Sequence, residues 1–324
     1  MEENTEQRLD LTLFSERIQE LKERIASVVV GQEQTVDLVL TAVLANGHVL
    51  IEGVPDVAKT LLARLTARLI DADFSRIQFT PDLMPSDVLG TTVFNMKTNG
   101  FDFHQGPIFA DIVLVDEINR APAKTQAALF EVMEERQVSI DGTTHRMGEL
   151  YTILATQNPV EQEGTYKLPE AQLDRFLMKI TMDYPSLEEE VNILERHHTN
   201  AALVKLDDIT PAITKEELLS LRAFMNQVFV DRTLLQYIAL IVQQTRTSKA
   251  VYLGASPRAS VAMLQSSKAY ALLQGRDFVT PEDIKFVAPY VLQHRLILTA
   301  EAEMEGYSPV KVTQRLIDKV EVPK

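Results

Sequence analysis

The residues most suited to chemistry begin in a loop at positions 53–60, which reads Gly-Val-Pro-Asp-Val-Ala-Lys-Thr. The loop follows a short apolar run and precedes a helical pattern. In such a strand–loop–helix turn, backbone N–H groups form a concave anion site, and the lysine and the hydroxyl residue complete a Walker A motif. We expect Lys59 to lie between the β- and γ-phosphates of ATP and Thr60 to ligate Mg²⁺. The expected nucleotide-binding residues of this segment are Gly53, Val54, Pro55, Asp56, Val57, Ala58, Lys59, Thr60 and Leu61.

Two residues of this loop depart from the usual pattern. Ala58 stands where a second glycine is usual, and Asp56 places a carboxylate in a loop that attracts anions. Aspartate adopts a left-handed backbone more readily than most residues, so the loop can keep its shape. The sequence leaves open whether Asp56 faces the phosphates or the solvent. We favour the first orientation, in which the carboxylate lowers nucleotide affinity or turnover.

A second group of candidate residues follows two other apolar runs. Ile112–Val115 leads into Asp116 and Glu117, a Walker B pattern. We expect Asp116 to hold Mg²⁺, usually through water, and Glu117 to polarise the attacking water as a general base. Asn158 follows the run Tyr151–Ala155 and could orient the lytic water against the γ-phosphate. Taken alone, either pattern could instead be a polar strand end or a turn.

The composition limits the classes of function. The chain has 324 residues and a formal net charge of −14, which argues against broad binding to nucleic acid or anionic membranes, although it leaves room for a local basic patch. Because there is no cysteine, disulfides, thiolate metal sites and cysteine nucleophiles are excluded. Residues 1–20 lack the apolar segment of a signal peptide, and no apolar stretch reaches the ~20 residues that span a bilayer. We therefore expect a cytoplasmic protein without direct membrane insertion.

The elements that position these residues alternate along the first part of the chain. Short apolar runs separated by helical patterns are typical of a parallel sheet covered by helices on both faces. The expected strands are 48–51, 77–79, 112–115, 152–155 and 177–181, and the first expected helices are 11–25, 33–45 and 61–70. Asn99-Gly100 and Asp141-Gly142 each lie between strand-like segments and predict two β-hairpins inserted into this fold.

Beyond Tyr184-Pro185-Ser186 the strand-like runs cease. Five helical patterns predict an all-helical second domain, at 188–198, 215–228, 231–245, 256–274 and 281–294. Thr280 is expected to cap the last of these helices, with Pro281 at its first position. We expect an α/β domain over residues 1–195 and a small helical domain over residues 196–324.

Taken together, these motifs resemble the MoxR family of AAA+ ATPases over nearly the whole chain. The motifs are Val30-Gly31-Gln32, Glu52-Gly53-Val54-Pro55 with Ala58-Lys59-Thr60, Gln78-Phe79-Thr80-Pro81-Asp82-Leu83, Asp116-Glu117-Ile118-Asn119-Arg120-Ala121-Pro122, Ala155-Thr156-Gln157-Asn158-Pro159, Leu168-Pro169-Glu170-Ala171-Gln172-Leu173-Asp174-Arg175-Phe176 and Gly254-Ala255-Ser256-Pro257-Arg258-Ala259. So many ordered motifs at this spacing are highly specific. The main departure is Asp56, where the family normally has glycine. The resemblance implies an AAA+ P-loop core with hairpin inserts, followed by a small all-helical lid domain.

The resemblance also implies roles for individual residues. Asn158 matches sensor 1, Arg175 matches the arginine finger, and Arg258 matches sensor 2 at the start of a lid helix. An arginine finger reaches the γ-phosphate bound by a neighbouring subunit and offsets charge in the transition state. Sensor 2 can couple the nucleotide state to the angle of the lid. Val30 and Gly31 would border the adenine.

An arginine supplied to a neighbour requires an assembly, so the resemblance implies a homo-oligomer, with a hexameric ring as the family expectation. For Arg175, a surface salt bridge with Asp174 or Glu170 is the alternative reading. MoxR-like ATPases are thought to act as chaperones or maturation factors on protein clients, often with partners that carry von Willebrand A domains.

The function expected from the sequence is ATP- and Mg²⁺-dependent hydrolysis coupled to remodelling of a partner protein. A nucleotide-responsive assembly scaffold is the alternative if Asp56 has weakened binding or hydrolysis. A nucleic-acid motor is a third reading, since related AAA+ proteins with the same inserts translocate DNA. The acidic net charge and the absence of a dense basic cluster in the Asp141-Gly142 hairpin weigh against that third reading.

Overall fold

A five-stranded parallel sheet forms the centre of the molecule. The computed structural model describes residues 11–53, 58–158, 164–199 and 209–323. The strands are β1 (Val49–Gly53), β2 (Phe74–Gln78), β5 (Ile112–Asp116), β8 (Thr152–Gln157) and β9 (Met178–Met182), in the order β2-β5-β8-β1-β9. Each pair of neighbouring strands is parallel, so all five carboxyl ends meet at one edge of the sheet. The five strands predicted from the apolar runs are confirmed.

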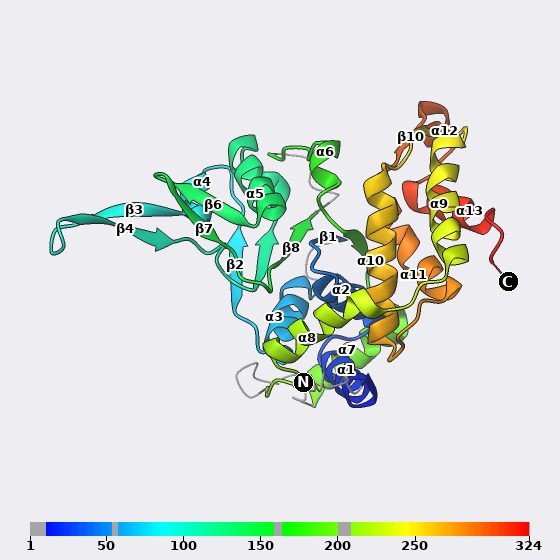
Figure 1. Cartoon of the computed structure of the whole chain (residues 1–324), viewed down its shortest axis with the longest axis horizontal. Helices are drawn as coiled ribbons and strands as arrows, with labels where there is room; N and C mark the ends of the chain where they lie inside the picture. Colours follow the sequence, from blue (N-terminus) through cyan, green and yellow to red (C-terminus); the bar gives the residue numbers. More distant parts are fainter. Residues whose placement is uncertain (1–10, 54–57, 159–163, 200–208, 324) are drawn as a thin grey trace, which may run out of the picture.

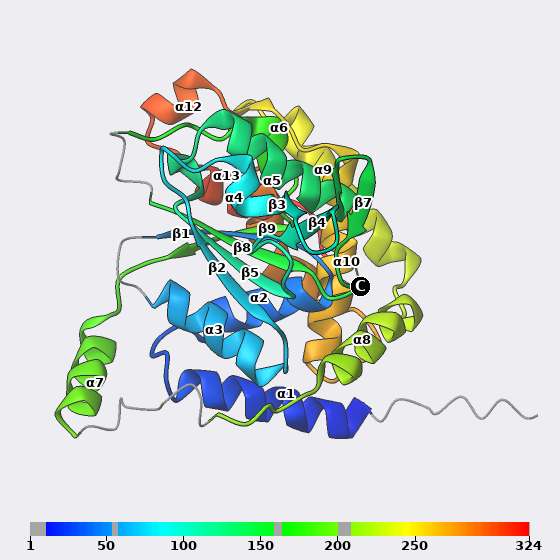
Figure 2. The ribbon, with the colours of Figure 1, turned by 90° about the vertical axis from the view of Figure 1, so that its left-hand side faces the viewer.

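Helices cover both faces of this sheet (Figure 2). One face packs against α1 (Leu11–Ala26), α2 (Glu33–Leu44) and α3 (Lys59–Leu69). The opposite face packs against α4 (Pro85–Leu89) and α5 (Ala123–Glu135). Successive strand residues point to opposite faces, so Val49 and Ile51 of β1 join the first core and Leu50 joins the second. Burial on both faces explains why the central strands β5 and β8 are largely apolar, whereas the edge strands β2 and β9 carry more polar residues.

Two antiparallel hairpins extend from the α/β part, as the Asn-Gly and Asp-Gly pairs predicted. β3 (Gly90–Asn95) pairs with β4 (Gly100–Gln105), and this hairpin projects far from the body (Figure 1). β6 (Gln137–Ile140) pairs with β7 (Thr143–Arg146) through a turn in which Asp141 and Gly142 have φ of 50° and 79°. Positive φ at both turn residues is the geometry that follows the twist of the flanking strands.

The C-terminal part is built mainly of helices, as predicted. α6 (Glu170–Leu173) precedes β9, and α7 (Leu187–His198) follows it. The remaining helices are α8 (Lys215–Phe224), α9 (Arg232–Thr247), α10 (Pro257–Leu273), α11 (Pro281–Leu292), α12 (Ala300–Met304) and α13 (Pro309–Asp318). Thr280 caps α11 by accepting a hydrogen bond from the Asp283 backbone, which confirms the predicted cap. The sequence did not predict the pairing of two short strands, β10 (Val251–Leu253) and β11 (Ile297–Leu298).

The predicted division between residues 195 and 196 stays a prediction. That position falls inside α7, and α10 of the C-terminal part packs on α2 and α1 of the first part. Residues from both parts therefore share one hydrophobic core. Within the described ranges, no helix combines the length and apolar character needed to cross a membrane.

Candidate functional site

The two described ends of the phosphate loop and the residues of the Walker B pattern lie at the carboxyl edge of the sheet. Gly53 ends β1, Asp116 ends β5, and β8 lies between these two strands. Glu117 and Asn158 directly follow the ends of β5 and β8. In an open α/β sheet this edge is the usual place for a ligand site. The structure thus brings Gly53, the two acids and Asn158 to one edge of the sheet.

The described part of the phosphate loop has the geometry of an anion site. Ala58 has φ 54°, a left-handed conformation, immediately before α3 begins at Lys59. Lys59 Nζ donates to the Gly53 carbonyl oxygen at 2.9 Å, so the lysine folds back across the loop. Thr60 and Leu61 lie in the first turn of α3, where backbone N–H groups and the helix dipole favour an anion. Val54, Pro55, Asp56 and Val57 lie outside the described residues.

The two acids of the Walker B pattern are held by partners on neighbouring strands. Asp116 is buried and pairs with Arg76 of β2, with Nε and Oδ2 2.6 Å apart. Glu117 accepts a hydrogen bond from Gln78 of β2 at 2.9 Å and pairs with Arg120 at 3.0 Å. Parallel pairing sets this arrangement, because Gln78 lies opposite Asp116 in the register of β2 and β5. Both carboxylates thus have cationic or amide partners on the protein.

The oxygen donors at this edge fit Mg²⁺. The ion prefers carboxylate and hydroxyl oxygens and keeps several waters, and Asp116 and Thr60 offer these groups. Arg76 occupies one oxygen of Asp116, so a bound cation would compete with the guanidinium for this carboxylate. The sequence signal for Arg76 and Gln78 was weak. Only Phe74 and Ile77 are apolar among the five residues of β2, so nothing distinguished Arg76 and Gln78 as site residues.

Thr156 links the two acids and was missed as a site residue. Its Oγ1 donates to Asp116 Oδ1 at 3.1 Å and accepts from the Glu117 backbone N–H, also at 3.1 Å. A single buried hydroxyl therefore fixes the carboxylate of one acid and the backbone of the other. Glu117 has φ 56°, so its left-handed backbone depends on such support.

Thr156→Val should lower the free energy of unfolding by about 1–3 kcal/mol, because it leaves a buried carboxylate oxygen and an N–H without this partner. Urea titration measures the change. Thr152→Val is the matched control, since Thr152 lies buried on the same strand and its hydroxyl has no partner among the described residues. Equal stabilities of the two variants would contradict the bridging role of Thr156.

Val30 and Gly31 lie between α1 and α2, away from the two acids in sequence. α2 leads back to the start of β1, so its first turn lies toward the carboxyl edge of the sheet. Gly31 has φ 71°, and the carboxylate of Glu189 in α7 lies where a β-carbon at position 31 would be. The left-handed backbone favours glycine here, whereas the Glu189 side chain could move aside for a β-carbon.

The two arginines predicted to act on the nucleotide lie at the opposite edge. Arg175 precedes β9, and Leu177 donates to the carbonyl of His48 just before β1. The five residues of β1, at about 3.3 Å each, place this segment roughly 15 Å from the phosphate loop. Arg258 lies at the start of α10, near the C-terminal end of α5. Arg175 and Arg258 are therefore together, and both are remote from their own chain's phosphate loop.

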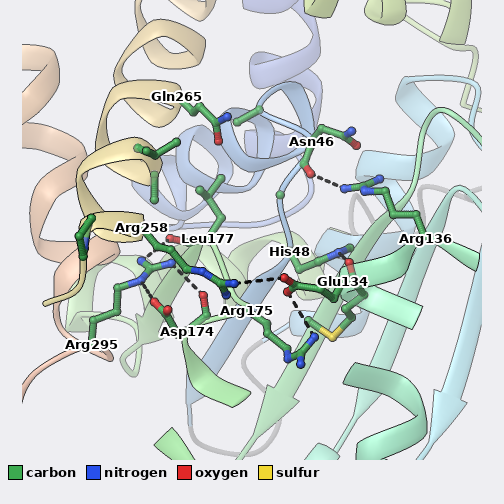
Figure 3. Close-up of a pocket in the computed structure, with 16 residues that line it drawn as sticks. Asn46, His48, Glu134, Arg136, Asp174, Arg175, Leu177, Arg258, Gln265 and Arg295 are labelled. Carbon is green, nitrogen blue, oxygen red and sulfur yellow. Dashed lines mark hydrogen bonds and ion pairs between the residues drawn. The ribbon is translucent and has the colours of Figure 1, made fainter. Parts of the chain in front are cut away.

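Glu134 of α5 holds both arginines (Figure 3). Arg175 Nη1 lies 3.2 Å from Glu134 Oε2 and donates to the Phe130 carbonyl at 2.9 Å, while Arg258 Nη2 lies 3.5 Å from Glu134 Oε1. The alternative reading, in which Arg175 pairs with Asp174 or Glu170, is wrong in its partner, because the ion pair is with Glu134. An open cleft of about 480 Å³ lies beside the two arginines.

Both the α/β part and the helical part of the chain are similar to known proteins. Residues 48–178 match the ATPase family associated with various cellular activities (AAA), and residues 243–318 match the AAA lid domain. The chain is 44% identical to Chaperone MoxR1 of Mycobacterium tuberculosis, over 93% of this chain and 81% of that protein. It is 48% identical to the uncharacterized protein YeaC of Bacillus subtilis over 93% of both chains, and 30% identical to Protein MoxR of Methylorubrum extorquens over 91% of both.

A solved structure extends this similarity to the whole fold. The crystal structure of a Cytophaga hutchinsonii protein, described as a candidate ATPase, superposes with a TM-score of 0.88 at 40% identity and covers 97% of both chains. The sheet flanked by helices, the helical lid and the sequence relatives agree. The chain belongs to the MoxR family of AAA+ ATPases.

Proposed function

We propose that this protein is an ATP- and Mg²⁺-dependent ATPase that assembles into a ring, with a hexamer as the expected size, and uses nucleotide turnover to remodel a partner protein. The observation that carries the proposal is the separation of the site into two halves. The phosphate loop and the acids lie at the carboxyl edge of the sheet, and Arg175 and Arg258 lie at the amino edge. Head-to-tail contact between copies joins one half to the other.

Within one subunit, the residues at the carboxyl edge bind the nucleotide and the cation and activate the attacking water. Lys59 and the N–H groups at the start of α3 hold the phosphates, and Thr60 and Asp116 hold the cation. When bound, the nucleotide would supply the γ-phosphoryl group and Mg²⁺ would neutralise part of its charge. Glu117 takes the proton of the attacking water once its carboxylate leaves Gln78, and Asn158 orients that water.

Between subunits, the residues at the amino edge complete the site. Arg175 stabilises charge on the γ-phosphate of the neighbour, and Arg258 acts from the same side. Glu134 keeps both guanidinium groups oriented before the neighbour binds, because its two carboxylate oxygens pair with one arginine each. Arg258 belongs to the lid, so its contact with the nucleotide of the adjacent subunit would couple that nucleotide to the position of the lid.

The partner in this proposal is a protein. The relative from Mycobacterium tuberculosis bears the name chaperone, which supports a role in remodelling or maturation. The proposed partner includes proteins that carry a von Willebrand A domain. The net charge of −14 disfavours nucleic acid as the substrate, and the reducing cytoplasm is the proposed compartment.

Asp56 supports a second candidate function, that of an assembly scaffold with weak nucleotide turnover. A carboxylate near the triphosphate repels it, and two like charges about 6 Å apart at an effective dielectric constant of about 40 interact by about 1.4 kcal/mol. We expect Asp56→Gly to bind ATP about tenfold more tightly than the parent protein.

Steady-state ATPase activity and ATP affinity of the two proteins, measured side by side, decide between these functions. The ATPase proposal requires Mg²⁺-dependent turnover in the parent protein. If only Asp56→Gly binds and hydrolyses ATP, the scaffold function replaces the ATPase function as our proposal. If the two proteins have equal affinity, Asp56 faces away from the phosphates.

A further inference from the structure

Arg295 of the helical lid is buried against the segment that carries Arg175. It lies between α11 and β11, and its side chain is only 4% exposed. Its Nε donates to Asp174 Oδ1 at 2.6 Å, across 121 positions of the chain. Figure 3 shows this ion pair beside Arg175 and Arg258. The pair therefore joins the lid directly to the residue that precedes the proposed arginine finger.

Arg295 also donates to three backbone carbonyls of the same segment, and one further N–H group donates to the Val291 carbonyl within α11. The three acceptors in the segment are the carbonyls of Phe176 at 2.7 Å, Leu177 at 3.1 Å and Asp174 at 3.3 Å. These carbonyls lie between the end of α6 and the start of β9, where neither a helix nor a strand supplies donors. The planar guanidinium, with five N–H groups in a fixed fork, can serve several acceptors at once, which a lysine ammonium cannot do in the same geometry.

The two residues before Arg295 strengthen this contact. His294 Nε2 lies 2.9 Å from the Phe176 carbonyl, and Gln293 Nε2 donates to the Lys179 carbonyl at 2.5 Å. Burial lowers the pKa of His294 well below its usual value, so the ring is neutral and Nε2–H is the donor. Three consecutive lid residues thus bind the backbone on both sides of Arg175.

From this geometry we infer that Arg295 is a positioning residue for the arginine finger, and that it makes the lid and the finger of one subunit move as a single unit. The inference deepens the proposed function and rests on it. Arg175 anchors its own guanidinium on Phe130 and Glu134, but the direction of its backbone is set by the carbonyls that Arg295 binds. A shift of the lid therefore changes the distance of Arg175 from the phosphate bound by the neighbour.

The test is Arg295→Lys, which keeps the charge and removes the fork. ATP affinity should stay within about twofold of the parent, because the variant's own phosphate loop lies at the other edge of the sheet. The turnover number should fall roughly ten- to hundredfold, the loss that follows from misplacing a catalytic group by about 1 Å. Mixing this variant with Lys59→Ala should restore turnover, since the second protein brings an intact finger to the intact phosphate loop of the first.

Arg276→Lys is the matched control. The Arg276 side chain is 27% exposed and forms an ion pair with the buried Asp283 inside the lid, at 2.5 Å. Its hydrogen bonds and its cation–π contact involve only Phe278 and Asp283 of the lid among the described residues. This variant measures what loosening an ion-paired lid arginine away from the finger segment does by itself, and we expect near-parental turnover. Asp174→Asn is a second variant that weakens the same contact from the other side. It keeps the test available if Arg295→Lys does not fold.

Directional rescue supports the inference, and a folded Arg295→Lys with parental turnover, or one that Lys59→Ala does not rescue, overturns it. Mixtures of Arg175→Ala with Lys59→Ala separate this failure from failure of the proposed function. If those mixtures recover activity while mixtures with Arg295→Lys do not, only the positioning role of Arg295 is wrong. If neither mixture recovers, the shared site between subunits is wrong.

Discussion

Glu117→Gln should lose ATP hydrolysis by roughly 10²- to 10⁴-fold while it still binds ATP, because the amide cannot accept the proton of the attacking water. The substitution preserves the size of the side chain. It also leaves in place the phosphate loop and Asp116, which carry nucleotide and cation binding in our proposal. Single-turnover hydrolysis and equilibrium ATP binding, measured on the same preparation, give the two quantities separately.

Glu131→Gln is the matched control for this substitution. Glu131 is exposed on α5 and does not lie at the carboxyl edge of the sheet. Parental hydrolysis by Glu131→Gln shows that loss of one negative charge is harmless. If Glu117→Gln hydrolyses ATP as fast as the parent, Glu117 is not the general base.

Arg175→Ala should reduce turnover by roughly 10³- to 10⁵-fold, the range found when an arginine finger is removed. The variant should bind ATP normally, because Arg175 lies at the opposite edge of the sheet from its own phosphate loop. Arg232→Ala, which removes an exposed arginine at the start of α9, controls for the change in charge. A loss of ATP affinity that matches the loss of turnover would place Arg175 at its own nucleotide instead.

The fold was largely predictable because the pattern of the sequence is physically simple. Strands buried on both faces are largely apolar runs. Gly53 and Asp116 are the last residues of two of them, and Asn158 directly follows a third. Parallel strands end at one edge, so residues at the ends of parallel strands are expected to lie at the same edge of the sheet. The hairpins were equally clear, because Asp141-Gly142 supports the positive φ values that a tight turn requires.

The partners of the site residues were not predictable in the same way. Arg76 and Gln78 reach the Walker B acids only through the register of β2 against β5, and Thr156 reaches them from β8. Arg295 contacts Asp174 across 121 positions, and no periodic pattern encodes such a contact. β10 and β11 are too short to produce a strand signal. Sequence patterns report local structure and burial, whereas these contacts depend on how distant elements pack.

The placement of Arg175 and Arg258 also required the structure. Resemblance assigned each residue a role, but it did not show that both lie at the edge opposite the phosphate loop or that Glu134 binds both. Because the two arginines are remote from their own phosphate loop, the proposed mechanism requires them to act on the nucleotide of another subunit. Each subunit carries a phosphate loop and a pair of arginines, but in the proposed mechanism the two belong to different sites. Each complete site therefore needs two subunits.

The most direct test of this account is steady-state ATP hydrolysis by mixtures of Arg175→Ala and Lys59→Ala at constant total protein. Each variant alone should be nearly inactive, since one lacks the finger and the other lacks the phosphate-loop lysine. In a mixed assembly, some boundaries join an intact phosphate loop to an intact finger, so activity should rise well above both parents and peak at an intermediate ratio. Mixtures no more active than the better single variant, although the two proteins assemble together, would contradict a site shared between subunits.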